Sequence, residues 1–265
     1  MKAGIREAKA LGRHMAERIE PETGKSSIRL YVAAPLREGA SIALSKDQTH
    51  YLKNVMRRSV GDTVRLFNGA DGEWLCVISV LNRNDSTLEA QSKVRDQTSL
   101  PDVWLVFAPI KKVRLDYLAQ KATEMGASKL QPVITSRTQV ARVNLERLAS
   151  NTIEAAEQCG CLSVPDVAEP APLKALLSDW DPVRQLVFCD EAPDVRPALE
   201  VLSKAAEGPY ALLIGPEGGF DPQEREMLRS LSFVLPISLG PRIMRADTAA
   251  VAALGIWQAT RGDWS

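Results

Sequence analysis

Short apolar segments alternate with helical segments along the C-terminal two thirds of the sequence, and this alternation restricts the possible folds most strongly. A strand that reaches the next strand through a helix returns parallel to it, so the pattern predicts a parallel sheet covered by helices. Ligands of such sheets bind beyond the carboxyl ends of the strands. We expect strands at residues 103–109, 129–135, 185–189, 210–214 and 233–238, and helices at 113–125, 144–158, 196–206, 222–231 and 246–260.

The sequence before about residue 100 has a different pattern. Strand-like segments are separated by turns such as 68–72 (NGADG) and 82–85 (NRND), which is typical of a small β-barrel. We expect strands at 28–33, 63–67, 73–80 and 87–94, and one helix at 47–58 that buries Leu52, Val55, Met56 and Ser59 and places Lys53 and Arg57 on its opposite face.

These patterns divide the chain into domains at residues 27–99 and 100–265. Residues 1–26 are interpreted as an N-terminal extension, flexible or helical, because a short amphipathic pattern is followed by the linker-like segment 21–27 (PETGKSS).

The composition is that of an ordinary globular protein, with 45% hydrophobic and 25% charged residues among 265. No apolar run approaches the roughly 18 residues that a membrane span needs, and residues 1–19 lack the apolar core of a secretory signal. Four cysteines and two histidines suggest neither a disulfide framework nor a zinc site. We therefore expect a cytoplasmic protein without a membrane partner and without a metal.

The net charge of zero conceals blocks of opposite sign. Residues 111–147 carry eight basic and three acidic residues, whereas residues 148–236 carry six basic and fifteen acidic ones. Such blocks leave room for a face that attracts a polyanion, although solvated helix faces explain them equally well.

One strand-to-helix turn stands out. Residues 211–222 (ALLIGPEGGFDP) run from a strand through a Gly-Pro-Glu-Gly-Gly turn into a helix, for which Asp221 suits the N-cap, Pro222 the first position and Glu224 the third. The paired glycines let backbone approach a ligand without a Cβ in the way, and a plain tight turn is the alternative. Dinucleotide and P-loop fingerprints are absent, and neither histidine lies in the α/β part, which disfavours Ser-His-Asp hydrolysis.

A second segment, residues 236–250 (PISLGPRIMRADTAA), again ends a strand in a Gly-Pro turn and enters a helix rich in small residues. Arg242 and Arg245 stand in the turn itself. Two such turns at neighbouring strand ends can form the walls of one slot.

These two turns resemble a known family. GPEGGF at 215–220 and LGPRIMRADTA at 239–249 are similar to motifs of the RsmE family of 16S ribosomal RNA uridine-N3 methyltransferases, a SPOUT family with a trefoil knot. Segments 50–58 and 60–69 resemble the family's PUA-like barrel, and 111–117, 121–126 and 154–158 resemble its middle part. The resemblance covers about residues 28–262.

The resemblance implies an α/β fold, with a C-terminal SPOUT α/β trefoil-knot methyltransferase domain and a small N-terminal PUA-like β-barrel RNA-binding domain. It implies S-adenosyl-L-methionine as cofactor, a homodimer, and 16S rRNA or the small ribosomal subunit as partner. The cofactor residues that it implies are Leu213, Ile214, Gly215, Pro216, Glu217, Gly218, Gly219, Ile237, Ser238, Leu239, Gly240, Ile243, Met244 and Arg245.

The chemistry suggests roles for two of these residues. Uracil N3 carries a proton in the neutral base, so methylation requires loss of that proton and stabilisation of the developing anion. Arg245 is the candidate guanidinium for the charge on O2 or O4, and Glu217 is a weaker catalytic candidate. A purely structural Arg245, paired with Asp247 or Glu217, is an equally weighted alternative.

Basic residues are candidates for contacts with RNA phosphates. They are His50, Lys53, Arg57 and Arg58 in the first domain and Lys111, Lys112 and Arg114 at the start of the second.

Two positions depart from the family pattern. Gly160-Cys161 stands where an arginine is usual, and Asp247 stands where glutamate is more usual. Cys159-Gly160-Cys161 is interpreted as a helix end rather than a metal or redox site.

Two other functions remain open on the sequence alone. One is a ribosome-assembly RNA-binding protein that has lost catalysis, and the other is a SPOUT methyltransferase that acts on another RNA, such as transfer RNA. The intact glycine turns favour the enzyme, because an RNA-binding protein need not keep a cofactor slot.

Overall fold

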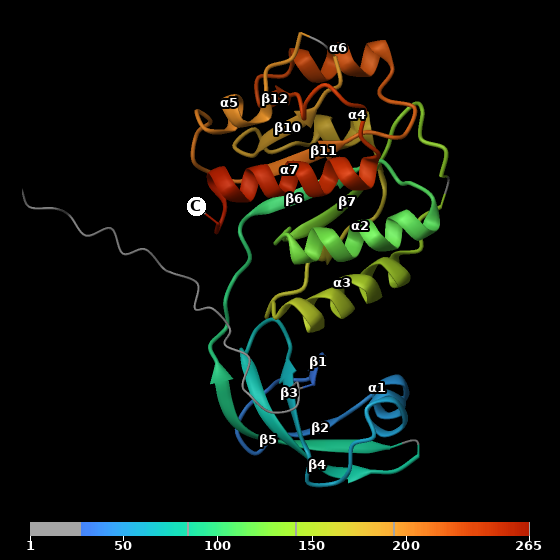
Figure 1. Ribbon diagram of the computed structural model, residues 1–265, viewed down its shortest axis with the longest axis vertical. Coiled ribbons are helices and arrows are strands. Elements are labelled where there is room, and N and C mark those ends of the chain that lie inside the picture. Colours follow the sequence, from blue (N-terminus) through green and yellow to red (C-terminus); the bar gives the residue numbers. More distant parts are fainter. Residues whose placement is uncertain (1–27, 84, 141, 193, 265) are drawn as a thin grey trace, which may run out of the picture.

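A computed structural model describes residues 28–83, 85–140, 142–192 and 194–264. It contains two separate sheets, one in each of two domains (Figure 1). The chain passes from one sheet to the other between β5, which ends at Arg95, and β6, which begins at Val103. The predicted N-terminal extension lies outside the described residues.

The C-terminal sheet is parallel at every pairing, as predicted. Its strand order is β12-β10-β11-β6-β7-β8, and β9 also pairs with β7. The strands are β6 (Val103–Phe107), β7 (Lys129–Ile134), β8 (Asp166–Val167), β9 (Ala171–Pro172), β10 (Gln185–Cys189), β11 (Tyr210–Ile214) and β12 (Val234–Ile237).

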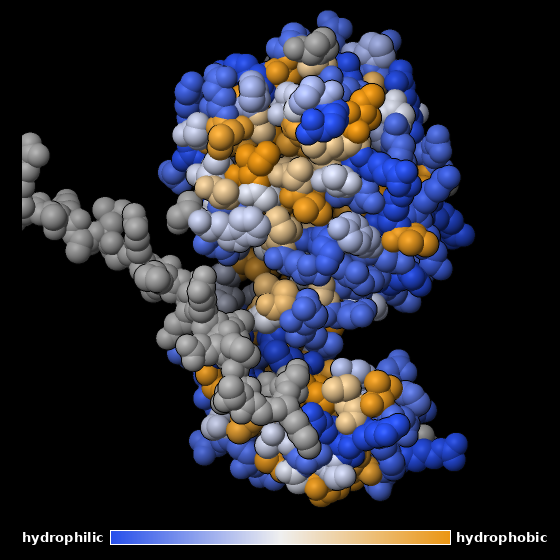
Figure 2. Space-filling model, in the orientation of Figure 1, coloured by the Kyte–Doolittle hydropathy of each residue, from blue (hydrophilic) through white to orange (hydrophobic). Residues whose placement is uncertain are grey.

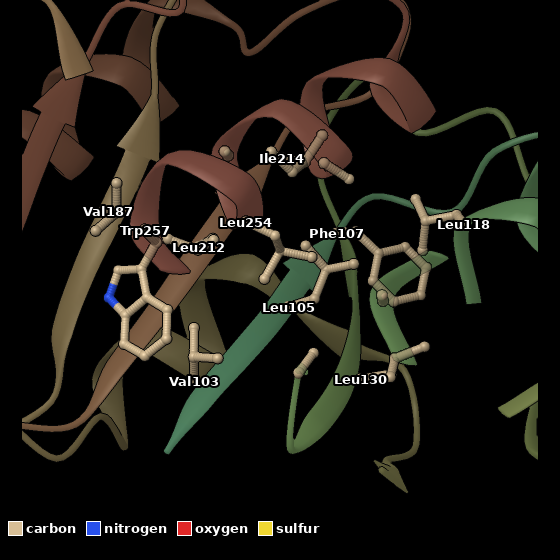
Figure 3. Packing of buried hydrophobic residues seen from close by; sticks show 14 of the residues in the cluster. Val103, Leu105, Phe107, Leu118, Leu130, Val187, Leu212, Ile214, Leu254 and Trp257 are labelled. Carbon is tan, nitrogen blue, oxygen red and sulfur yellow. The ribbon is translucent and has the colours of Figure 1, made fainter. Parts of the chain in front are cut away.

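Helices cover both faces of this sheet. One face packs against α2 (Lys112–Glu124), α3 (Leu145–Cys159), α5 (Ala198–Leu202) and α7 (Ala246–Arg261), and the other against α4 (Leu173–Ser178) and α6 (Pro222–Ser230). Consecutive strand residues point to opposite faces, so each strand contributes to two hydrophobic cores. Figure 3 shows Leu254 and Trp257 of α7 lying over β6 and β11, beside Leu105 and Leu212. The parallel α/β prediction is therefore confirmed.

The segment that follows β10 contacts the end of β12 in two places. The carbonyl of Ile237 accepts a hydrogen bond from the amide of Asp190, just after β10 (2.9 Å). Ser238 donates to the carbonyl of Arg196 (2.8 Å) and accepts from the amide of Ala198 (3.0 Å). The end of β12 is therefore held by residues on both sides of the connection from β10 to α5. The predicted trefoil knot is an exception to the rule that connections do not thread through one another.

The N-terminal domain is a small sheet of five strands in the order β1-β3-β4-β5-β2. Only β1 and β3 are parallel, and the remaining pairs are antiparallel. The strands are β1 (Arg29–Tyr31), β2 (Ser41–Ala43), β3 (Thr63–Phe67), β4 (Glu73–Leu81) and β5 (Ser86–Arg95). Their inward side chains form a separate core that includes Leu30, Ile42, Leu66 and Ile78.

The prediction of one helix at 47–58 is wrong in its second half. The segment consists of α1 (Lys46–His50) and a π-helical turn, η1 (Tyr51–Val55). The amide of Met56 donates to the carbonyl of Tyr51, five residues back (2.9 Å), which widens the helix and rotates the side chains that follow. Leu52 is buried as predicted, but Val55 is 57% exposed and Ser59 is also exposed.

The two domains meet at the end of α3. The guanidinium of Arg29, in β1, donates to the carbonyls of Ala156 (2.8 Å), Glu157 (2.8 Å) and Cys161 (3.0 Å). Arg95, in β5, donates to the carbonyl of Gly160 (3.0 Å). The departure from the family pattern at 160–161 therefore lies in a domain contact.

The Cys-Gly-Cys segment is a helix end, as predicted. α3 ends at Cys159, and Gly160 caps it in the left-handed conformation (φ 86°) that glycine adopts without strain. A hydrogen bond from the Cys161 thiol lowers the pKa of Cys159. Among the described residues, no group of three or more His, Cys, Asp and Glu side chains could hold a metal ion. No helix in that part of the chain is long and apolar enough to cross a membrane.

Candidate cofactor and active site

A cavity of about 210 Å³ lies at the carboxyl edge of the parallel sheet. Three loops surround it, which follow β10, β11 and β12, and its floor includes Ile214 at the end of β11. The lining residues are Cys189, Asp190, Glu191, Ile214, Gly215, Pro216, Glu217, Gly219, Phe220, Arg225, Ile243, Met244, Arg245, Ala246 and Ala249. The two turns predicted to form one slot therefore do face each other.

Eight of the predicted cofactor residues line this cavity, and six do not. Leu213 and Ile237 are buried in the cores on the two faces of the sheet, and Leu239 packs against one of those cores. Ser238 is held by hydrogen bonds to Arg196 and Ala198, while Gly218 and Gly240 are exposed.

Sequence reasoning missed the wall that follows β10. Cys189, Asp190 and Glu191 line the cavity, because the strand predicted at 185–189 ends at the same edge as its parallel neighbours. The predicted end of this strand could have identified these residues, because parallel strands end at the same edge of a sheet. The Asp190 carboxylate is completely buried and contacts Arg225 (3.3 Å) and Arg229 (2.7 Å) of α6, so the loop is fixed to that helix. Burial raises the pKa of the Cys189 thiol to about 12, so this thiol stays protonated at neutral pH.

The glycine turn after β11 disfavours side chains at two positions. A Cβ on Gly215 would lie 2.5 Å from the Phe220 ring, and Gly219 adopts φ +67°, where a Cβ would lie 2.5 Å from Oε1 of Glu191. Gly218 differs, because a Cβ there would make only ordinary contacts with Arg137, at 3.6 Å or more. The close approach predicted for the glycine pair therefore applies to Gly219 and not to Gly218.

The start of α6 is as predicted. Asp221 accepts from the amide of Glu224 (2.9 Å), Glu224 accepts from the amide of Asp221 (3.2 Å), and Pro222 is the first helical residue. The hydrogen bond from the Glu224 amide lowers the pKa of the Asp221 carboxyl. Glu224 also accepts from the amide of Ser136 (2.8 Å), which fastens the loop after β7 to the same place.

Arg245 lies at the N-cap of α7, lines the cavity and is exposed. It forms no ion pair with any described residue, so the pairing with Asp247 or Glu217 is not present within this chain. Asp247 instead accepts from the neighbouring amide of Thr248 (3.0 Å). The guanidinium is therefore available to a bound ligand. Glu217 is exposed at the opposite wall.

The predicted RNA-contacting residues fall into two groups. In the barrel, His50, Lys53 and Arg57 are exposed and Arg58 is half-buried, but Arg57 follows η1 in a left-handed conformation (φ 51°). It therefore does not share a helical face with Lys53, contrary to the prediction.

The second group lies at the edge that bears the cavity. Lys111 is the N-cap of α2 and Lys112 its first residue; both are exposed, and Arg114 is half-buried. The amide of Ala108 donates to the carbonyl of Ile214 (3.0 Å), which brings this turn beside the cavity. On the face shown in Figure 2, a notch separates the two domains; its upper side is mainly hydrophilic, and its lower side is mixed.

The sequence matches family models of RNA methyltransferases. A family model described as an RNA methyltransferase domain matches residues 97–258, and one described as an RNA methyltransferase PUA domain matches residues 44–91.

Several curated proteins resemble nearly the whole chain. Ribosomal RNA small subunit methyltransferase E of Rickettsia conorii is 33% identical over 227 residues, covering 85% of this chain and 93% of that protein. The Bacillus subtilis protein of the same name is 26% identical and covers 83% of this chain and 90% of its own. The chain therefore belongs to the ribosomal RNA small subunit methyltransferase E family, which confirms the resemblance seen in its motifs.

Solved structures of methyltransferases have a similar fold over nearly the whole chain. Ribosomal RNA small subunit methyltransferase E of Neisseria gonorrhoeae, bound to S-adenosyl methionine, is 26% identical, with a TM-score of 0.78 over 90% of this chain and 100% of that one. A methyltransferase of Legionella pneumophila, in complex with the same cofactor, is 28% identical, with a TM-score of 0.80 over 88% of this chain and 97% of that one.

Proposed function

We propose that this protein transfers the methyl group of S-adenosylmethionine to N3 of a uridine in 16S ribosomal RNA. The observation that supports this most strongly is the cavity between the three loops, into which an unpaired Arg245 projects from the start of α7. A non-catalytic RNA-binding protein gains nothing from a cavity whose walls exclude side chains at Gly215 and Gly219.

The residues present fit the cofactor. Ile214, Ile243, Met244 and Ala249 supply an apolar wall, and Gly215 and Gly219 leave backbone accessible at the other side. The loops that follow β10, β11 and β12 would hold the cofactor between them. When bound, it supplies an electrophilic methyl group.

The protein's own task is to prepare the uracil nitrogen. N3 becomes nucleophilic only after it loses its proton, and the resulting charge spreads onto O2 and O4. In this proposal, Arg245 donates hydrogen bonds to one of these oxygens as the charge develops, which lowers the barrier. Glu217 lines the same cavity and is the second, weaker catalytic candidate, as a base that could accept the N3 proton. Transfer then depends on in-line positioning and uses no metal ion.

We further propose that the enzyme acts in the cytoplasm as a homodimer, with the barrel and the start of α2 as its RNA platform. Ile243 is 94% exposed beside the cavity, and an apolar side chain in this position is well suited to burial by a second copy. Lys53 and Arg57 on the barrel and Lys111 and Lys112 at the cavity edge present cations on both sides of the domain boundary, and the His50 ring is exposed on the barrel as a further polar contact.

Gly219→Ala is expected to weaken S-adenosylmethionine binding about tenfold. A non-glycine residue at φ +67° costs roughly 1–3 kcal/mol, and about 1.4 kcal/mol is tenfold in affinity. Gly218→Ala is the control and should bind within about twofold of wild type, because its Cβ meets only ordinary contacts. Calorimetry of the full chain measures both. Wild-type affinity in Gly219→Ala would remove this glycine from the cofactor site.

The proposed function is tested with purified protein, methyl-labelled S-adenosylmethionine and unmodified RNA. Free 16S rRNA, small subunits assembled from it, and transfer RNA are supplied separately, and digested products are identified by nucleoside mass spectrometry. Label in N3-methyluridine from 16S rRNA supports the proposal. Label only in transfer RNA, or RNA binding with no label in any substrate, would favour one of the two alternative functions.

A further inference from the structure

A second, larger hollow adjoins the cofactor cavity. It has a volume of about 620 Å³ and is open to solvent, and we call it the α6 groove. It shares Glu191, Phe220 and Arg225 with the cofactor cavity, so the two hollows are adjacent. Its lining residues are Arg137, Glu191, Phe220, Pro222, Arg225, Glu226, Arg229 and Ser230.

Only one of the three arginines in the groove forms no ion pair among the described residues. Arg225 contacts Asp190 and Glu191 (3.3 and 3.0 Å), and Arg229 contacts Asp190 and Asp194 (2.7 and 3.1 Å). Arg137, by contrast, forms no ion pair in the described part of the chain.

Arg137 is exposed and makes one hydrogen bond to the protein, in which Nη1 donates to the carbonyl of Gly218 (2.9 Å). A guanidinium has five N–H donors, so most of them remain available to a ligand.

The backbone that presents Arg137 is held firmly. The amide and hydroxyl of Thr135 contact the hydroxyl of Thr138 (both 2.9 Å), and the amide of Thr138 donates to the carbonyl of Thr135 (3.1 Å). The amide of Ser136 donates to Glu224 at the start of α6 (2.8 Å). This fixed turn holds Arg137 between the groove and the loop that forms a wall of the cofactor cavity.

We propose that Arg137 binds a backbone phosphate of the RNA strand next to the target uridine, and that this strand lies in the α6 groove. A planar guanidinium suits a phosphate because two of its N–H groups can donate to two phosphate oxygens. The hydrogen bond to Gly218 then links the phosphate contact to the cofactor loop. The inference rests on the proposed function, since it assigns a binding residue to the same RNA substrate.

The test uses three full-length variants and the unmodified 16S rRNA transcript as probe. Arg137→Gln removes the charge but keeps an amide that can donate to Gly218, whereas Arg137→Lys keeps the charge. Lys204→Gln is the matched control, because it removes a cation that is 71% exposed in the turn after α5 and lines neither hollow. RNA affinity is measured from about 50 to 200 mM salt, and cofactor affinity is measured in parallel.

Arg137→Gln is expected to bind the RNA about tenfold more weakly, and the slope of log affinity against log salt should fall by about 0.7, as for one lost phosphate contact. Its cofactor affinity should stay within about twofold of wild type, and Arg137→Lys should keep the slope. A wild-type slope in Arg137→Gln, whether RNA affinity is unchanged or falls together with cofactor affinity, would overturn the inference. Failure of the wild-type protein to form N3-methyluridine would instead count against the proposed function.

Discussion

Arg245→Ala is expected to slow single-turnover methylation about 100-fold at saturating S-adenosylmethionine, because a donor to developing negative charge contributes roughly 3 kcal/mol to the barrier. Arg245→Lys should lose less, since lysine keeps the charge but lacks the planar fork. Cofactor affinity should change little in either variant, because the interaction forms mainly in the transition state. Rapid-quench kinetics with 16S rRNA measures the rates.

The structural alternative for Arg245 makes a different prediction. If Arg245 served only to anchor the turn through Asp247, Asp247→Asn would reproduce the loss of rate, and both variants would melt earlier than wild type. The absence of an ion pair between them, with Asp247 accepting from Thr248 instead, leads us to expect normal melting for Arg245→Ala. A wild-type single-turnover rate in a normally folded Arg245→Ala protein would rule out the catalytic role.

Glu73→Ala is expected to reduce the free energy of unfolding by about 3–5 kcal/mol, the usual cost when one partner of a buried ion pair is removed. The Glu73 side chain is completely buried and contacts Arg29, Arg65 (3.5 Å) and Arg95 (3.7 Å). Two of these arginines also bind the end of α3, so the variant should loosen the contact between the domains as well.

Urea unfolding of the full chain measures this change. Glu207→Ala is the control, because Glu207 pairs with Arg261 but is 87% exposed, and an exposed pair contributes little. A loss below about 1 kcal/mol in Glu73→Ala would show that the buried carboxylate does not hold the three arginines together.

Local signals predicted much of the fold. The strands of the parallel sheet are continuous apolar runs, because both of their faces are buried, and such runs are visible in one sequence. The start of α6 was equally clear, since Asp221, Pro222 and Glu224 form a capping signal within four residues. The end of α3 at Cys159 followed from the glycine beside it.

Other features depend on distant contacts, which local patterns do not encode. Strands β2, β8 and β9 and helix α4 were not predicted, because three or fewer strand residues, or six helical ones, leave no period to detect. Helix α5 spans only Ala198–Leu202 rather than 196–206, and it begins late because residues 196–198 pair with Ser238.

The sequence likewise predicted only part of the candidate site. Both glycine turns were found, but Asp190 and Arg137 were missed because their positions depend on the order of the strands and on a loop that folds back onto α6.

The most direct test is nucleoside mass spectrometry of 16S rRNA from a strain that lacks this gene. We expect N3-methyluridine to be present in the parent strain, absent in the deletion strain and restored by the wild-type gene but not by Arg245→Ala. An unchanged level of N3-methyluridine in the deletion strain would contradict the proposed function.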